Sequence, residues 1–300
     1  MKKLFQHLFP WKHPFWWVLI FFLFCGAYAA WREYDYRCAV REAHVAGFSW
    51  KCFGHLDGLY WTWQSVVPKK VPDEYRRNLE IESVDDLAPY SRLIRRLRPR
   101  RVALQNCTTL KTMDALKGLV SLRELELRNC RDLQNLDALE RLTELQILTI
   151  SGCPGLQNIE GIKSLDALKE LTISRSCIAL QSVDVFKGLT GLQGIFLVGC
   201  PALQNIDGIK GLSTLQQLCL DHCPALRSVD SIKELARLEK LWLDGCTSLQ
   251  NVDVLMGLTK LQRLSLSDCH NLPASNLREL RTALPNTDIT FPDGTESPPQ

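Results

Sequence analysis

The sequence predicts an α/β solenoid, in which short units stack side by side and each adds one strand to a curved parallel sheet. Three observations predict it. A cysteine recurs about every 23 residues, the same leucine spacing precedes each cysteine, and apolar residues recur every three positions after it. A unit of this length cannot bury its apolar face alone, so neighbouring units must stack to make a core. The cysteines are Cys107, Cys130, Cys153, Cys177, Cys200, Cys223, Cys246 and Cys269.

An uncharged stretch rich in aromatic residues, residues 14–31, follows a leader of residues 1–13. About 18 apolar residues are enough for a helix to cross a bilayer. Trp16, Trp17 and Trp31 lie near its ends, where aromatic rings prefer the headgroup region. We therefore expect an uncleaved, single-pass transmembrane helix. The small-x-small triplet of residues 27–29 leaves a cleaved signal segment open as the alternative.

The topology of the body relative to the membrane is less strongly indicated. Lys and Arg are evenly balanced on the two sides of residues 14–31, so the positive-inside rule gives no direction. The short leader favours a cytoplasmic amino terminus and an extracytoplasmic body. The many thiols suit a reducing cytosol better, unless burial protects them. A cytosol-facing body therefore stays open.

Residues 32–98 are expected to form a membrane-proximal region and an N-terminal cap. Cys38 and Cys52 could form a disulfide if the body is exported. The same cysteines with His44 and His55 could suggest a metal site or, together with Asp57, an enzyme site. Only Cys52 and His55 have tight ligand spacing, and no spacing sets a nucleophile beside a base, so we expect neither a metal nor catalysis.

A basic run, residues 91–101, closes this region. Its apolar residues Leu93, Ile94 and Leu97 recur at helical spacing, which favours a helix with a solvated basic face. The formal net charge of the chain is +3, which is too small to indicate nucleic acid as a partner.

The strand of each unit lies just before its cysteine. In Leu122-x-x-Leu125-x-Leu127-x-x-Cys130, Leu125 and Leu127 alternate, so both point into the core. This pattern resembles the leucine-rich-repeat family, whose repeat reads L-x-x-L-x-L-x-x-N/C-x-L. The resemblance covers residues 99–272 as eight copies. It implies a curved parallel sheet whose concave face binds proteins.

Two departures from the family pattern occur within the eight copies. Pro99 replaces the leading leucine of the first copy. One copy has an additional residue, so that Ser176 takes the cysteine position and Cys177 is displaced by one. A local bulge is expected there, without a break in the solenoid.

The arm that follows each cysteine predicts a short helix or 3₁₀ turn. Leu203, Ile206, Ile209 and Leu212 recur every three residues and would line the back of the core. An acidic residue stands seven positions after each cysteine except the last, where we expect it to act as an N-cap of this turn. One acid per repeat cannot supply the six or more oxygens that calcium needs. The acids are Asp114, Asp137, Glu160, Asp184, Asp207, Asp230 and Asp253.

The cysteines themselves are expected to be structural. In stacked units they lie along a line at about strand spacing, roughly 4.8 Å, and do not converge on one point as zinc requires. A buried cysteine behaves as a small apolar residue with a weak donor.

A C-terminal cap is predicted over residues 273–293. Ser275 would cap a helix carrying Leu277, Leu280 and Leu284, and Ile289 with Phe291 would form a last strand. The polar, proline-rich residues 294–300 are expected to be a disordered tail.

One outward-facing position of each strand defines a column along the concave face: Ala103, Glu126, Thr149, Thr172, Phe196, Cys219, Trp242 and Ser265. Most members are small or polar, and the exceptions are three neighbours. Two strand spacings, roughly 9–10 Å, would separate Phe196 from Trp242. An apolar aromatic centre with a charged rim is typical of a protein-binding hot spot. The candidate partner-binding residues are Phe196, Val198, Cys219, Asp221, His222, Lys240, Trp242 and Asp244.

The sequence thus predicts a membrane-tethered, non-catalytic protein that binds a protein partner on its concave face. No P-loop, dinucleotide-binding glycine motif, HExxH or GxSxG occurs. We expect no cofactor, no metal, no nucleic acid and no small-molecule substrate. A cytosol-facing assembly or regulatory adaptor is the first alternative. An enzyme with its site in residues 32–98 and repeats that select its substrate is the second.

Overall fold

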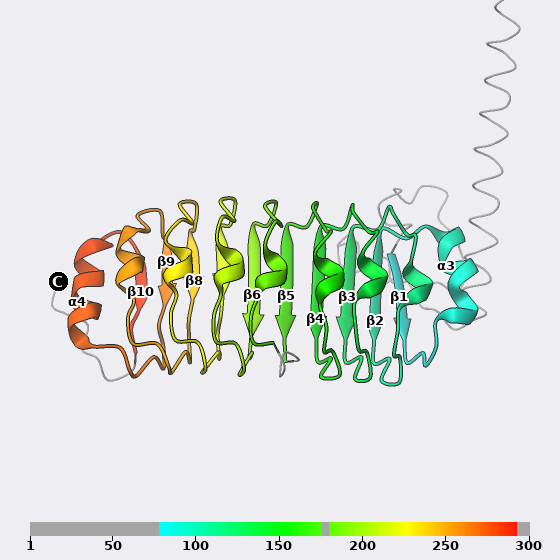
Figure 1. Cartoon of the computed structure of the whole chain (residues 1–300), viewed down its shortest axis with the longest axis horizontal. Helices are drawn as coiled ribbons and strands as arrows, with labels where there is room; N and C mark the ends of the chain where they lie inside the picture. Colours follow the sequence, from blue (N-terminus) through cyan, green and yellow to red (C-terminus); the bar gives the residue numbers. More distant parts are fainter. Residues whose placement is uncertain (1–77, 176–179, 293–300) are drawn as a thin grey trace, which may run out of the picture. The chain divides into compact units, whose positions relative to one another are not determined.

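A computed structural model describes residues 78–175 and 180–292, and within them ten strands form one sheet (Figure 1). Every strand is parallel to its neighbours, and the strands follow one another in sequence order, as stacked repeats require. The strands are β1 (Asn78–Glu82), β2 (Arg101–Gln105), β3 (Glu124–Arg128), β4 (Ile147–Ser151), β5 (Glu170–Ser174), β6 (Gly194–Val198), β7 (Gln217–Cys219), β8 (Lys240–Trp242), β9 (Arg263–Ser265) and β10 (Asp288–Thr290).

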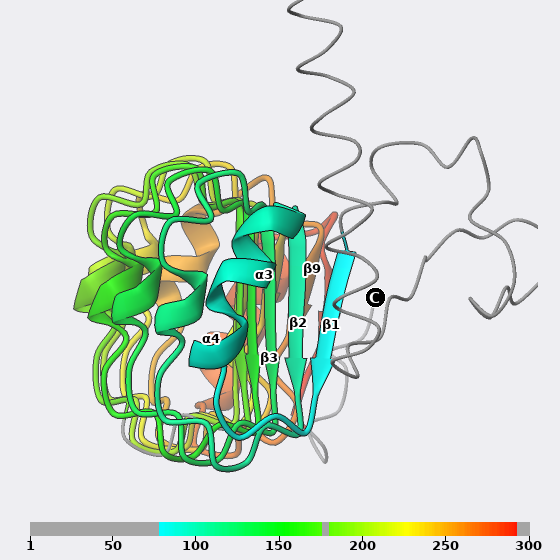
Figure 2. The same cartoon turned by 90° about the vertical axis from the view of Figure 1, so that its right-hand side faces the viewer.

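A row of 3₁₀ turns lies opposite the sheet, and Figure 2 shows the two layers from one end of the stack. The prediction of a short helical turn after each cysteine is therefore confirmed, and the turns are of the 3₁₀ type. They are η3 (Asp114–Leu116), η4 (Asp137–Leu139), η5 (Glu160–Ile162), η6 (Asp184–Phe186), η7 (Asp207–Ile209), η8 (Asp230–Ile232) and η9 (Asp253–Gly257).

The core lies between these two layers and consists of stacked leucine and isoleucine side chains. Leu127 and Leu148 of neighbouring strands are fully buried, as is Ile209 of a 3₁₀ turn. Burying such a side chain contributes about 1.5–3 kcal/mol. Because each copy contributes the same layers, the core runs without interruption from the first repeat to the last.

The additional residue of one copy leaves the sheet intact. Each strand residue from β1 to β4 pairs with the residue 23 positions later, whereas Thr172 of β5 pairs with Phe196, 24 positions later. The register of the outward column is therefore continuous across this step. The predicted bulge at Ser176 and Cys177 lies outside the described residues.

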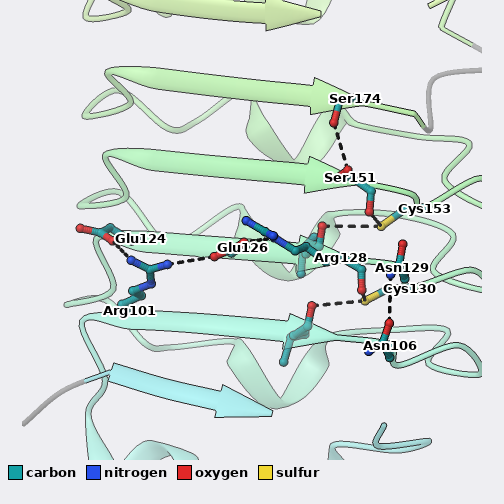
Figure 3. Close-up of polar contacts among 12 residues, drawn as sticks. Arg101, Asn106, Glu124, Glu126, Arg128, Asn129, Cys130, Ser151, Cys153 and Ser174 are labelled. Atoms are coloured by element: carbon teal, nitrogen blue, oxygen red, sulfur yellow. Dashed lines mark hydrogen bonds and ion pairs between the residues drawn. The ribbon is translucent and has the colours of Figure 1, made fainter. Parts of the chain in front are cut away.

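The cysteines form a buried ladder beside the carboxyl ends of the strands. Cys130 donates its thiol proton toward the carbonyl oxygens of Leu104 and Arg128, at 3.8 and 3.6 Å from Sγ (Figure 3). Cys246 makes the same contact with Leu220 O at 3.1 Å. The thiols thus donate to backbone carbonyls and lie in a row, in agreement with the predicted structural role.

The acidic column does not cap the turns, and this part of the prediction is wrong. Each acid is the first residue of its 3₁₀ turn, so its own backbone N–H is the group that needs an acceptor. Asn251 Oδ1 accepts the N–H of Asp253 at 2.6 Å. The residues that accept in this way are Asn135, Asn158, Asn205, Ser228 and Asn251.

The acid side chains point to solvent instead, and three of them pair with a lysine three positions later. The Asp207 carboxylate lies 2.9 Å from Lys210 Nζ, and the hydroxyl of Ser231, followed by this lysine, holds the pKa of the carboxyl below its usual value. The other two pairs are Asp114–Lys117 and Asp184–Lys187. Exposed pairs of this kind contribute little to stability, because solvent and salt screen their charges.

Each end of the stack is closed by a helix. At the first repeat, α3 (Ser91–Leu97) buries Leu93, Ile94 and Leu97, as its spacing predicts, after the short 3₁₀ turn η2 (Ala88–Tyr90). At the last repeat, α4 (Ala274–Ala283) precedes β10. The residue at its N-cap position is Pro273, so Ser275 lies inside the helix and does not cap it.

Several predictions concern segments that the structure does not describe. The transmembrane helix of residues 14–31, the Cys38–Cys52 disulfide, the site proposed around His44 and His55, and the C-terminal tail all lie outside the described residues. Within residues 78–175 and 180–292, no helix combines the length and the apolar character needed to cross a bilayer.

Candidate functional site

The strand register brings the three unusual residues of the outward column together. Phe196 of β6 pairs with Cys219 of β7, and Cys219 pairs with Trp242 of β8. The residues that continue the column on either side, Thr172 and Ser265, are small. We call Phe196, Cys219 and Trp242 the aromatic cluster.

The two rings of this cluster touch each other across the middle strand. Their centroids are 6.4 Å apart and their planes are inclined by 37°. The strand spacing alone predicts a separation of about 9–10 Å, so the two side chains lean toward one another over Cys219. Cys219 is buried beneath them, whereas both rings remain half-buried. A tilted aromatic pair at this distance is a favourable arrangement that fixes both side chains.

A chain of hydrogen bonds supports the cluster at the carboxyl end of its strands. The Cys219 thiol donates to Asp221 Oδ2 at 3.1 Å, and the backbone N–H of Asp244 donates to Asp221 Oδ1 at 3.0 Å. Asp244 Oδ1 in turn accepts the hydroxyl of Ser265 at 2.5 Å and the backbone N–H of Ser267 at 2.9 Å. The two carboxylates are therefore held in fixed positions beside the aromatic rings.

Burial shifts the acid–base properties of these groups. It raises the pKa of the Asp221 carboxyl, and the thiol donor of Cys219 and the N–H of Asp244 partly offset the shift. Burial also raises the pKa of the Cys219 thiol, to about 12. Cys219 is therefore a protonated donor at neutral pH and is not a reactive thiolate.

The remaining predicted residues surround the cluster. Val198 follows Phe196 at the end of β6, and Lys240 begins β8 two residues before Trp242. His222 is exposed and has a positive φ of 57°, and its imidazole lies so close to Gly245 that a Cβ atom there would be 2.6 Å from His222 Nδ1. Val198 and Lys240 are half-buried.

A hollow of about 250 Å³, which is not among the features predicted from the sequence, opens beside the cluster. It lies at the start of β4 to β7, where Gly194 provides no side chain and the ring of Phe196 forms a wall. A Cβ atom on Gly194 would be 3.0 Å from Cε2 of Phe196. The sequence signal is glycine at a strand position that other copies fill. The lining is Gln146, Ile147, Lys169, Glu170, Gln193, Gly194, Phe196, Gln216 and Gln217.

An ionic cluster occupies the other half of the concave face (Figure 3). Arg101 of β2 reaches Glu124 at 3.3 Å and Glu126 at 2.9 Å, and Arg128 also pairs with Glu126. Glu126 is buried between the two guanidinium groups. The sequence places these residues on neighbouring strands, so cross-strand pairing could have predicted the cluster. Its charges neutralise one another.

The comparisons with known proteins identify the repeats. A family model for the BspA-type leucine-rich-repeat region matches residues 100–200 and 175–287, with six copies. A comparison with curated protein sequences finds no match.

Solved structures of leucine-rich-repeat proteins are similar in fold. The leucine-rich-repeat domain of the type III effector XopL is 24% identical, with a TM-score of 0.62, and the alignment covers 74% of this chain and 78% of that one. Internalin C2 from Listeria monocytogenes is 23% identical, with a TM-score of 0.56 and coverage of 67% and 83%. Together with the ten-stranded parallel sheet and the 23-residue register, the family match shows that this chain belongs to the BspA-type leucine-rich-repeat family.

Proposed function

We propose that this chain is a non-catalytic recognition scaffold, which binds a protein partner through the aromatic cluster on its concave face. The observation that carries the proposal is the contact between Phe196 and Trp242 at 6.4 Å on an otherwise small or polar surface. Leucine-rich-repeat domains generally mediate protein–protein interaction, and solenoids offer extended concave surfaces for it. The Phe196–Trp242 contact indicates where on the concave face of this chain the partner binds.

The burial of the aromatic cluster favours a binding role over a packing role. The inward residues of the same strands, such as Leu197 and Leu241, are fully buried, whereas Phe196 and Trp242 keep part of their rings in contact with solvent. Large aromatic side chains that are already fixed in position lose little entropy on binding and are enriched in hot spots. The aromatic cluster is therefore preorganised for binding a partner.

A second part of the proposal concerns the membrane. We propose that residues 14–31 tether the chain as a single-pass helix and that the repeats lie on the extracytoplasmic side. The apolar stretch and the short leader support this arrangement. Free thiols do not argue against it, because all eight cysteines of the described residues are buried. A cytosol-facing adaptor is the alternative.

The recognition role is tested by replacing Phe196 and Trp242 with alanine. Cross-linking pull-down from native membranes should recover the partner with the original chain and lose it with the double variant. Val120 is 58% exposed and lies away from the strands, so Val120→Ala is the matched control and should leave capture unchanged. A circular dichroism spectrum with a normal parallel-sheet signal shows that the double variant is folded. Unchanged capture by a folded double variant contradicts the proposal.

The topology is tested separately with one exposed thiol. Thr259 is exposed on the 3₁₀ side, and Thr259→Cys introduces a reactive cysteine among buried ones. A maleimide that cannot cross membranes should label this variant on spheroplasts above the level of the original chain. Labelling that appears only after the membrane is permeabilised places the repeats in the cytosol.

A further inference from the structure

The charges of the concave face are balanced in one half and unbalanced in the other. In the half formed by β2 and β3, Arg101, Glu124, Glu126 and Arg128 neutralise one another. Beside the aromatic cluster, Asp221 and Asp244 lie on neighbouring repeats, and neither forms an ion pair with a basic side chain of the described residues. Carboxylates without a basic partner in the described part of the chain therefore lie beside the aromatic cluster, at the carboxyl ends of β7 and β8.

The opposite end of the aromatic cluster has different chemistry. The hollow over Gly194 combines an aromatic wall, the apolar side chain of Ile147 and several glutamine amides. Lys169 and Glu170 both line this hollow, so its charges balance, and Lys240 begins the strand that carries Trp242. A basic group of a partner gains no net attraction at this end and is attracted to the two carboxylates at the other, whereas an apolar group is accepted in the hollow.

From this arrangement, and on the basis of the proposed function, we infer that the partner is a protein segment with two anchors. An apolar side chain fills the hollow over Gly194, and a basic side chain reaches Asp244 and Asp221 beyond the rings of Phe196 and Trp242.

The geometry of the strands sets the distance between the two anchors. Gly194 and Val198 are four residues apart on β6, which corresponds to about 13 Å along the strand. Asp221 and Asp244 lie at the level of Val198 but one and two strands away, so their diagonals from Gly194 are about 14 and 16 Å. An extended partner therefore carries the basic residue four or five positions from the apolar one, and a helical partner carries it about nine to eleven positions away, because a helix rises by about 1.5 Å per residue.

The basic anchor gains from both the rings and the carboxylates. A guanidinium group can stack on the face of Trp242 while its N–H groups donate to the carboxylate of Asp244. The hydrogen bonds from Cys219, Ser265 and Ser267 hold both acids in place before binding. Binding of the partner therefore costs little conformational entropy in these side chains.

The inference is tested with a random peptide library displayed on phage and selected against the immobilised full chain. The enriched peptides should share an apolar residue and an Arg or Lys at one of the stated spacings. Gly194→Gln fills the hollow with the side chain that Gln217 carries at the paired position, and should weaken binding of synthetic versions about tenfold or more. Gly257→Gln is the control, because a side chain there meets open space.

The charged anchor has its own variant. Asp244→Asn keeps an oxygen that accepts the bonds from Ser265 and Ser267 but removes the charge, and should weaken binding of the basic peptides about tenfold. Asp132→Asn, at an exposed acid elsewhere, should have no effect. Peptides that need Phe196 and Trp242 but are acidic, or are insensitive to Gly194→Gln and Asp244→Asn, overturn the inference and leave the proposed function standing. If no peptide depends on Phe196 and Trp242, both fail.

Discussion

At the scale of single residues, the position in the repeat gives identical side-chain types different roles. Cys219 ends β7 on the concave face and donates to Asp221, whereas Cys223 lies beyond the strand, belongs to the ladder and donates to the carbonyl of Leu197. The turn at His222, where φ is 57°, separates the two thiols, so the local backbone and not the chemistry of the thiol decides the role. A count of cysteines alone therefore says little about metal binding or redox state.

The buried thiols predict how the stability depends on pH. Burial raises the pKa of Cys219 to about 12 and that of Cys269 to about 11, from an ordinary value of 9.0. In the unfolded chain these thiols ionise above about pH 9, so the unfolded state loses protons first. The stabilisation is complete below pH 9 and is lost as the pH rises, by about 1.4 kcal/mol per pH unit for each thiol.

Urea unfolding at a series of pH values between about 8 and 11 measures this dependence. Cys219→Ala should reduce the slope of the unfolding free energy against pH above about pH 9, because one of the thiols is gone. An identical slope in the variant means that Cys219 does not remain protonated in the folded chain.

The sequence predicts which residues face outward but not how their side chains meet. The column from Thr172 to Ser265 follows from the repeat, and the register confirms it. The contact between Phe196 and Trp242 depends on side-chain rotation over the small Cys219, and repeat spacing contains no information about rotation. The hollow over Gly194 depends on the same ring position.

At the scale of elements, each repeat is a strand and a 3₁₀ turn joined by loops whose backbone groups need partners. The turn is three residues long in most copies, too short to satisfy its own N–H groups. In η4, η5, η7, η8 and η9, Asn or Ser two residues before the turn supplies the acceptor. The acidic residue at the start of each turn is charged and periodic, so the sequence favours it as the cap. In η9, however, the neutral Asn251, two residues earlier, accepts the backbone N–H of Asp253.

The asparagine two residues before η9 provides a test. Asn251→Ala removes the acceptor for the N–H of Asp253 and the donor to its carboxylate, and should lower the unfolding free energy by about 1 kcal/mol. Gln250→Ala, at the exposed neighbouring residue, should change it by less than about 0.5 kcal/mol. Equal effects of the two substitutions in urea unfolding would show that the asparagine is not needed.

At the scale of the described repeats, the stability of each unit depends on its contacts with the units before and after it. The sheet order is the sequence order, so each strand contacts only the strands before and after it. Such a stack behaves approximately as a one-dimensional chain of units. The caps matter because each terminal unit has one neighbour fewer, and α3 and α4 cover those two ends.

A substitution in the C-terminal cap should therefore have a graded effect. Leu280 of α4 is fully buried, and Leu280→Ala should destabilise the cap by about 2–5 kcal/mol. Hydrogen exchange should become faster in β9 and β10 and change little in β2 and β3. An equal loss of protection in all strands would show that the repeats unfold as one unit instead.

The specificity of a solenoid for its partner lies in the outward side chains and not in the fold. Every copy presents the same backbone, so recognition depends on the few outward residues that break the repeat pattern. In the proposed function these are the residues of the aromatic cluster and Gly194 beside them.

Site-specific photo-cross-linking tests this claim most directly. A photoreactive phenylalanine analogue in place of Trp242 probes the concave face, and the same analogue in place of Val120 probes the opposite side of the repeats. In native membranes, we expect a cross-linked protein partner from position 242 and none from position 120. Cross-links from position 120 alone, or equally from both positions, would contradict recognition through the aromatic cluster.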